Sequence, residues 1–183
     1  MQKLPTLKTP RLILRPFKMS DSAKVAEMAN HKEIATNTQN LPFPYEQHMA
    51  LDWIRAHPHM YEDDHMLTLA VVSRKKGIVM GAIGLEIDST NNNAELGYWL
   101  GTDYWGQGFA TEAAKRIVYY GFNDLNYHRI HSIHLSQNPA SGNVLKKIGM
   151  THEGTYRQHI LKWGEYLDAE LYGILKDEFK SSI

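Results

Sequence analysis

The chain has 183 residues, 43 % apolar and 22 % charged, a balance typical of a folded globular protein rather than of a disordered tail. Its 20 basic and 20 acidic residues cancel, and no apolar run approaches the roughly 20 residues of a membrane span, so we expect no nucleic-acid or membrane partner. The absence of cysteine excludes disulfides, thiolate metal sites and a cysteine nucleophile. We expect a single domain over residues 1–183. Because the start of the chain lacks an apolar core of signal-peptide length, we also expect a cytoplasmic protein.

The first part of the chain alternates a short strand with helical stretches. Leu12–Leu14 predict a strand, and Ser20 opens an amphipathic stretch with Val25 and Met28 on its apolar side. Residues 37–45 contain two prolines and predict a loop, after which residues 47–57 show helical spacing. Loops that flank such helices often form substrate walls.

The central part changes to the periodicity of strands. The apolar runs 67–73 and 78–87 are rich in β-branched residues and predict a hairpin. A turn of three asparagines, 91–93, then leads into a third strand over residues 94–100. From Ala110 to Phe122 the apolar residues recur at spacings of 3 and 1, which predicts the strongest helix of the chain.

The last part continues the mixture of strands and helices. Residues 129–135 predict a strand, and a short helix follows because Asn138 caps it, Pro139 starts it and Gly149 ends it. Residues 154–175 alternate as two strands joined around Trp163 and Gly164.

One junction, AELGYWLGTDYWGQGFATEA at residues 94–113, carries a functional signal because a strand runs through a glycine-rich turn into the strong helix. Gly106 and Gly108 let a ligand approach the backbone, and the free amides and dipole of the helix favour a diphosphate. The Lys-Ser/Thr of a P-loop is missing after Gly108, and the third glycine of a dinucleotide fingerprint is replaced by Ala113 or by nothing in register. A plain helix-entry turn and a different phosphate-bearing cofactor both fit.

Together with TPRLILRPF, NPASGNVLKKIGM and EGTYRQHILKWGEYLDAELYGIL, this junction resembles the GNAT acetyltransferases. Within them it is most similar to the RimJ/RimL-like branch, which includes N-terminal acetyltransferases of ribosomal proteins. The superfamily pattern has Gln or Arg first, Gly fourth and Gly or Ala sixth, and Trp105, Gly108 and Ala110 occupy these positions here. Trp at the first position occurs in the RimJ/RimL-like branch. The resemblance implies an α+β GNAT fold: a single mixed, mostly antiparallel sheet whose central parallel strand pair splays, flanked by helices.

The resemblance also implies a reaction, in which an acetyl group moves from acetyl-CoA to a primary amine without a metal or an acyl-enzyme. The expected acceptor is a protein N-terminal α-amine of the ribosomal-protein type. A small amine (a polyamine, amino acid or aminoglycoside) and a non-catalytic acyl-CoA-binding module are the alternatives, and a homodimer is compatible with each. The residues expected to bind the coenzyme, with the diphosphate on the glycine turn and the pantetheine arm along the strand, are Trp99, Leu100, Gly106, Gln107, Gly108, Phe109, Ala110, Thr111, Asn138 and Ser141.

Two residues are candidates for proton transfer. By the resemblance, the hydroxyl of Ser141 reaches the coenzyme sulfur and protonates the leaving thiolate, although it could simply satisfy an amide of the first helical turn. Glu95 could be the general base that deprotonates the acceptor ammonium, or a solvated carboxylate at a strand edge. Glu112 lies in the first turn of the strong helix, where its charge favours the helix dipole and predicts a structural role.

Two further groups have competing interpretations. His128, His131 and His134 suggest a metal site, but on a strand His131 points away from the other two, which argues against a metal. Four aromatic residues could line an acceptor pocket, but side chains at such spacings usually pack in a core or at its rim; they are Trp53, Trp163, Tyr166 and Tyr172.

Overall fold

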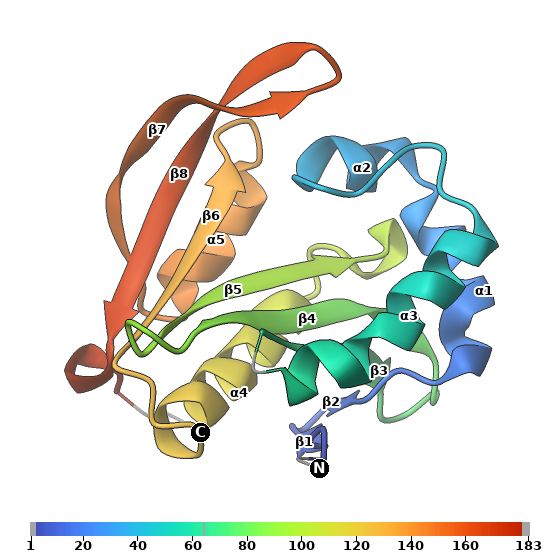
Figure 1. The fold of residues 1–183 in the computed structure, drawn as a ribbon, viewed down its shortest axis with the longest axis horizontal. Coiled ribbons are helices and arrows are strands. Elements are labelled where there is room, and N and C mark those ends of the chain that lie inside the picture. The colour runs from blue at the N-terminus through green and yellow to red at the C-terminus, as the bar shows by residue number, and fades with distance from the viewer. Residues whose placement is uncertain (1–2, 64, 181–183) are drawn as a thin grey trace.

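A computed structural model describes residues 3–63 and 65–180, and its centre is one twisted sheet of eight strands in the order β1-β2-β3-β4-β5-β6-β8-β7 (Figure 1). The strands are β1 (Leu7–Lys8), β2 (Leu12–Arg15), β3 (Met66–Ser73), β4 (Val79–Asp88), β5 (Asn93–Leu100), β6 (Arg129–Leu135), β7 (Thr151–Lys162) and β8 (Glu165–Leu175). The helices are α1 (Ser22–Ala29), α2 (Lys32–Asn37), α3 (Gln47–Glu62), α4 (Phe109–Asn123) and α5 (Pro139–Lys147), with short 3₁₀ turns at Met19–Asp21, Thr102–Tyr104 and Lys176–Glu178.

The pairing between β5 and β6 is the parallel step in an otherwise antiparallel sheet. It runs only from Asn93 opposite Arg129 to Glu95 opposite His131. Beyond Glu95 the two strands diverge, β5 staying with β4 and β6 with β8 (Figure 1). At the start of the gap the Ser132 hydroxyl donates to the Leu96 carbonyl at 2.7 Å, in place of a backbone bond. The splayed parallel pair and the mixed sheet are therefore confirmed.

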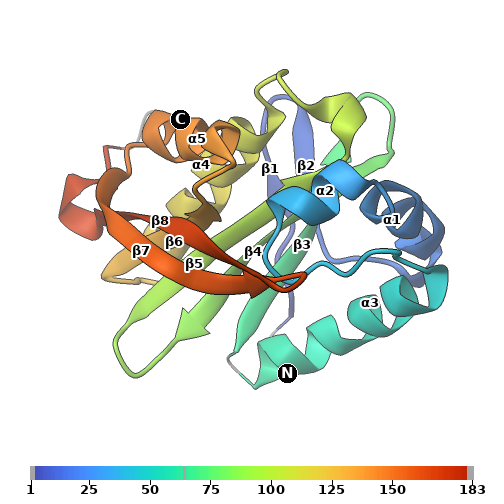
Figure 2. The ribbon, with the colours of Figure 1, turned by 90° about the horizontal axis from the view of Figure 1, so that it is seen from above.

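Helices cover both faces of the sheet (Figure 2). Helix α4 packs its apolar stripe on one face, where Ile117, Val118 and Phe122 are fully buried in the larger core, and α5 lies beside it. Helices α1 and α3 cover the other face around a smaller core that includes Val25 and Ile54. The gap between β5 and β6 therefore has a different helical layer on each side.

All the predicted helices and strands form. The structure contains two further elements, and two of the predicted ones are longer than the sequence indicates. Strand β1 and helix α2 were not predicted; α2 has six residues and buries only Ile34 and Ala35. Helix α3 continues through Pro58 to Glu62, and β7 begins at Thr151, shortly after α5 ends at Lys147. Within residues 3–63 and 65–180, no helix is both long enough and apolar enough to cross a membrane.

Candidate active site

The gap between β5 and β6 opens into a cavity of about 1090 Å³ whose walls come from both faces of the sheet. The glycine turn before α4 and the first turn of α5 form one wall, including Gly108 and Ser141. Side chains of α3 and of the loop after α2, such as Trp53 and Leu41, form the opposite wall. Two molecules that enter from opposite faces can therefore meet between the strands.

The structure brings the predicted site residues together around this cavity, with Gln107 as the exception. Gln107 is turned into its own loop: its side-chain amide donates to the Asp103 carbonyl at 2.8 Å, and its backbone carbonyl accepts from Arg11 at 3.0 Å. Those that line the cavity are Glu95, Trp99, Leu100, Gly106, Gly108, Phe109, Ala110, Thr111, Asn138 and Ser141.

The turn before α4 has the geometry of an anion site. Gly106 and Gly108 have φ angles of 71° and 78°, a left-handed conformation that a residue with a Cβ adopts only at a cost. Gly108 is the N-cap residue of α4 and has no side chain with which to cap the helix. The amides of the first turn have no carbonyl partner within the helix and lie at the positive end of its dipole, so they can bind a phosphate.

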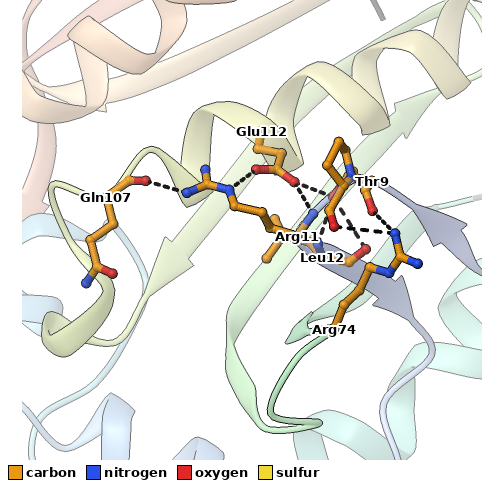
Figure 3. Close-up of polar contacts among 7 residues, drawn as sticks. Thr9, Arg11, Leu12, Arg74, Gln107 and Glu112 are labelled. Carbon is orange, nitrogen blue, oxygen red and sulfur yellow. Dashed lines mark hydrogen bonds and ion pairs between the residues drawn. The ribbon is translucent and has the colours of Figure 1, made fainter.

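Residues 9–11 are bound to this turn and to the first helical turn of α4 (Figure 3). The Glu112 carboxylate accepts hydrogen bonds from the Thr9 hydroxyl at 2.6 Å, the Arg11 amide at 2.8 Å and Arg11 Nε at 2.5 Å. Burial alone would raise the pKa of Glu112, but the hydrogen bonds from Thr9 and Arg11 outweigh burial and lower it. Glu112 therefore anchors the N-terminal segment; the sequence predicts a structural role for this residue but not these contacts.

Every second residue of β5 directs its backbone N–H and C=O groups toward the gap. The Leu100 carbonyl accepts a hydrogen bond from the Trp105 indole at 2.7 Å on that side. The Trp99 carbonyl faces β4 instead, since a Cβ on Gly81 would come within 2.1 Å of it. By the alternation of a strand, Tyr98 and Leu100 direct their backbone groups toward the gap. The Trp105 side chain fixes the end of β5.

Ser141 is held at the cavity by the N-cap of α5 and by Tyr98 of β5. The Asn138 side chain caps the helix by accepting from the Ser141 amide at 3.2 Å, and its Nδ2 donates to the Asn37 carbonyl at 3.3 Å. The Ser141 hydroxyl lies 2.8 Å from the hydroxyl of Tyr98 on β5. Burial raises the pKa of Tyr98 to about 12, so this phenol stays protonated at neutral pH.

Glu95 lies at the last paired position of the β5–β6 ladder and lines the cavity. Its Oε2 is 3.5 Å from His131 Nε2, and Glu86 stands opposite it on β4. Among the described residues, His131 Nδ1 is buried without a hydrogen-bond partner. A hydrogen on Nδ1 would have no acceptor there, so the ring hydrogen is better placed on Nε2, the nitrogen close to the carboxylate.

In the structure, the histidines and aromatic residues singled out in the sequence lie in different places. His131 faces Glu95, whereas His134 packs against Gly142 of α5 and its ring stacks on that of Tyr172. In the part of the chain that the structure describes, no three His, Asp or Glu side chains converge as a metal ion would require. Trp53 lines the cavity and Tyr172 is buried, while Trp163 and Tyr166 are exposed on the β7–β8 hairpin.

The loop after α2 lines one side of the cavity, and three side-chain hydrogen bonds hold this loop and the end of α2. Lys162 Nζ donates to the Thr38 carbonyl at 2.6 Å, and Gln39 Nε2 donates to the Ile133 carbonyl at 3.3 Å. Gln137 Nε2 reaches the Thr36 carbonyl at 3.2 Å. Burial lowers the pKa of Lys162. The sequence predicts a loop here, of a kind that often forms a substrate wall, but not the contacts that hold it.

Comparison with known proteins identifies what this arrangement resembles. The family model described as "Acetyltransferase (GNAT) domain" matches residues 11–151. The N-acetyltransferase p20 of Bacillus licheniformis is 29 % identical over 175 residues, covering 95 % of this chain and 98 % of the relative.

Two solved structures share the fold. Mycobacterium smegmatis RimJ in complex with CoA-disulfide has a TM-score of 0.88 and 20 % identity over 98 % and 91 % of the two chains. Spermidine N-acetyltransferase from Vibrio cholerae, in complex with CoA and spermine, has a TM-score of 0.80 and 23 % identity over 93 % and 98 %.

Proposed function

Because this chain belongs to the acetyltransferase (GNAT) domain family and is an N-acetyltransferase, we propose that it moves the acetyl group of acetyl-CoA to a protein N-terminal α-amine. The observation that carries this proposal is the cavity in the β5–β6 gap, which joins the anion site of α4 to Ser141 and Glu95. We further propose that residues 1–183 act as a single domain in the cytoplasm.

On the coenzyme side, we propose that the amides from Gly106 to Thr111 hold the diphosphate and that the pantetheine arm pairs with β5 in the gap. The left-handed glycines and the uncapped start of α4 support the first contact. The alternation of β5 supports the second, because the backbone groups of Tyr98 and Leu100, and not those of Trp99, are directed toward the gap. An amide in the gap stabilises the charge that develops on the thioester oxygen.

On the catalytic side, bound acetyl-CoA supplies the thioester carbonyl that the amine attacks. Glu95 removes the proton that the acceptor ammonium must lose, and the position of its carboxylate at the start of the gap supports this role. The Ser141 hydroxyl donates to the departing sulfur. Tyr98 remains protonated, and when it donates to Ser141 Oγ the serine hydrogen is left free for the sulfur.

The acceptor side of the cavity suits an ammonium group, and two classes of amine acceptor fit it. Glu86 and Glu95 stand opposite each other on β4 and β5 and attract a cation. An N-terminal α-amine agrees with the resemblance to the RimJ/RimL-like branch, whereas a polyamine agrees with the likeness to the spermidine enzyme, which was solved in complex with CoA and spermine. The pair of carboxylates is the observation that favours keeping the polyamine as the second candidate.

The deciding experiment measures the release of free CoA thiol with panels of N-terminal peptides and of small amines. A peptide with a free α-amine should be acetylated with the higher kcat/KM, and the same peptide with a blocked N-terminus should be inert even when it contains lysine. Preference for spermidine over every peptide would replace the proposed acceptor. Acetyl-CoA that binds without thiol release for any amine would support the non-catalytic binding module instead.

A further inference from the structure

Arg11 takes part in the coenzyme turn from outside the cavity. Its Nη1 donates to the Gln107 carbonyl at 3.0 Å, and its guanidinium lies over the Phe109 ring, 4.4 Å from the centroid. Its Nε and backbone amide both bind Glu112, so the side chain has little freedom (Figure 3). Arg74 secures the same segment from the other side by donating to the Thr9 carbonyl at 2.8 Å.

The hydrogen bond to Gln107 determines which way one peptide unit faces. The carbonyl of Gln107 and the amide of Gly108 belong to the same trans peptide and therefore point in opposite directions. With the carbonyl directed at Arg11, which lies outside the cavity, the Gly108 amide is directed the other way. Gly106 and Gly108 both line the cavity, so this is the side on which an anion would bind.

The orientation of the Gln107–Gly108 peptide has to be fixed because glycine residues flank Gln107. Gly106 and Gly108 flank Gln107 and have left-handed φ angles of 71° and 78°, and glycine passes between φ regions more easily than any residue with a Cβ. Without a partner for the Gln107 carbonyl, the peptide can rotate and turn an oxygen toward the phosphates. A carbonyl oxygen in that place repels an anion, whereas an amide binds it.

The charge of Arg11 has a second consequence at the same place. Glu112 is an acidic residue in the first turn of α4, close to the amides that would bind a diphosphate. An unpaired carboxylate there would oppose the attraction of the helix dipole for an anion. Its ion pair with Arg11, Nε to Oε2 at 2.5 Å, offsets that negative charge.

We propose that Arg11 is a positioning residue of the coenzyme site, which holds the Gln107–Gly108 peptide with its amide toward the diphosphate and neutralises Glu112. This inference rests on the proposed binding of the diphosphate by residues 106–111. The N-terminal segment, which is about 100 residues from the glycine turn in sequence, then contributes to the affinity for acetyl-CoA.

The test compares the dissociation constants of CoA from the parent protein and from Arg11→Ala by calorimetry. One oriented hydrogen bond to a charged ligand corresponds to a loss of roughly 10- to 100-fold in affinity. In kinetics, the KM for acetyl-CoA should rise while kcat changes little. With acetyl-pantetheine, which lacks the diphosphate, Arg11→Ala and the parent should have the same kcat/KM. An equal loss with acetyl-pantetheine would overturn the assignment.

Two matched variants separate positioning from charge and from stability. Arg11→Lys keeps the charge but not the fixed spacing of Nε and Nη1, so it should also weaken CoA binding; parental affinity in this variant would overturn the role of the peptide. Thr9→Val removes the 2.6 Å bond to the same carboxylate without touching Gln107, so it should lower the melting temperature but leave CoA affinity at the parental value.

The outcomes also distinguish this inference from the function on which it rests. If the parent itself fails to bind CoA, the proposed function is wrong. If the parent binds CoA and both Arg11 variants, folded by circular dichroism, bind it equally well, the function stands and the role of Arg11 is wrong.

Discussion

The hydroxyls of Ser141 and Tyr98 lie 2.8 Å apart, one on α5 and the other on β5. Each element borders the gap, so the pair links α5 to β5. The Tyr98 hydroxyl also lies 3.1 Å from the Ser141 carbonyl, so its single hydrogen is donated either to this carbonyl or to Ser141 Oγ. The serine hydrogen is left free for another acceptor when Tyr98 donates to Oγ.

Ser141→Ala should lower turnover by roughly 10- to 1000-fold, the range expected for the loss of one oriented donor. Affinity for acetyl-CoA should change little, because the Asn138 cap uses the backbone amide of residue 141 and survives the change. Tyr98→Phe is the companion variant and should reduce kcat less than Ser141→Ala. Steady-state kinetics with both substrates varied provide the measurement. Parental kcat in Ser141→Ala would show that the thiolate leaves without this donor.

Glu95→Gln keeps the shape of the side chain but removes the base. The rate should fall near neutral pH and recover as rising pH deprotonates the amine in solution. Glu86→Gln, on the neighbouring strand, is the matched control and should change the rate, relative to the parent, by the same factor at every pH. The measurement is kcat/KM from pH 6 to about pH 10. A Glu95→Gln profile that runs parallel to that of the parent would indicate a positioning role instead.

At the scale of the element, α3 contains a polar group in an apolar setting. His57 is 2 % exposed, both ring nitrogens lack partners among the described residues, and its ring lies 4.4 Å from that of Trp53. Phe17 completes this aromatic cluster. Burial lowers the pKa of His57 to about 4.

This lowered pKa predicts an acid-sensitive fold. The unfolded chain takes up a proton at a pKa near 6.5, whereas the folded protein does so near 4, so stability is lost as pH falls through this window. Between about pH 7.5 and pH 5 the loss from His57 amounts to roughly 2 kcal/mol. His57→Phe should remove that part of the pH dependence in urea unfolding, and His59→Gln, an exposed histidine of the same helix, should leave it unchanged. An unaltered pH dependence in His57→Phe would contradict the assignment.

The elements were more predictable than the contacts of the site. Helix α4 and strands β3 to β5 have periodic apolar patterns, so their sequences predict them closely. Helix α2 could not be found, because six residues with two buried side chains have no detectable period. The glycine turn and α5 were recognised by local motifs. Tyr98 and Arg11 were missed because their partners, Ser141 and Gln107, lie 43 and 96 residues away in sequence.

At the scale of the whole molecule, the sheet consists of two parts joined along β5 and β6. The backbone pairing between them ends at Glu95 and His131, after which the strands separate. The sequence could suggest this division only through the family resemblance, since strand periodicity contains no information on where neighbouring strands part. A ligand in the gap would contact both parts.

Binding of CoA should therefore stabilise the molecule as a whole. At 100 times its dissociation constant a ligand contributes about 2.7 kcal/mol, which corresponds to a rise in Tm of roughly 5–10 °C for a protein of this size. Amide hydrogen exchange should slow in both β5 and β6. The measurement is made in EDTA, with a nicotinamide dinucleotide as the control ligand. Loss of the shift in EDTA, or an equal shift with the dinucleotide, would contradict diphosphate binding by backbone amides.

The outer strand β7 has a consequence for the behaviour of the protein in concentrated solution. It has twelve residues, is almost entirely exposed and ends the sheet, so its free edge could template strand addition by another molecule. The register of its pairing with β8 shifts between His152 and Gly154 and again between Tyr156 and Ile160, and Gln158 has a φ of 49°. These irregularities break the row of free amides and carbonyls into short pieces. The same hairpin can thus remain exposed without seeding fibrils.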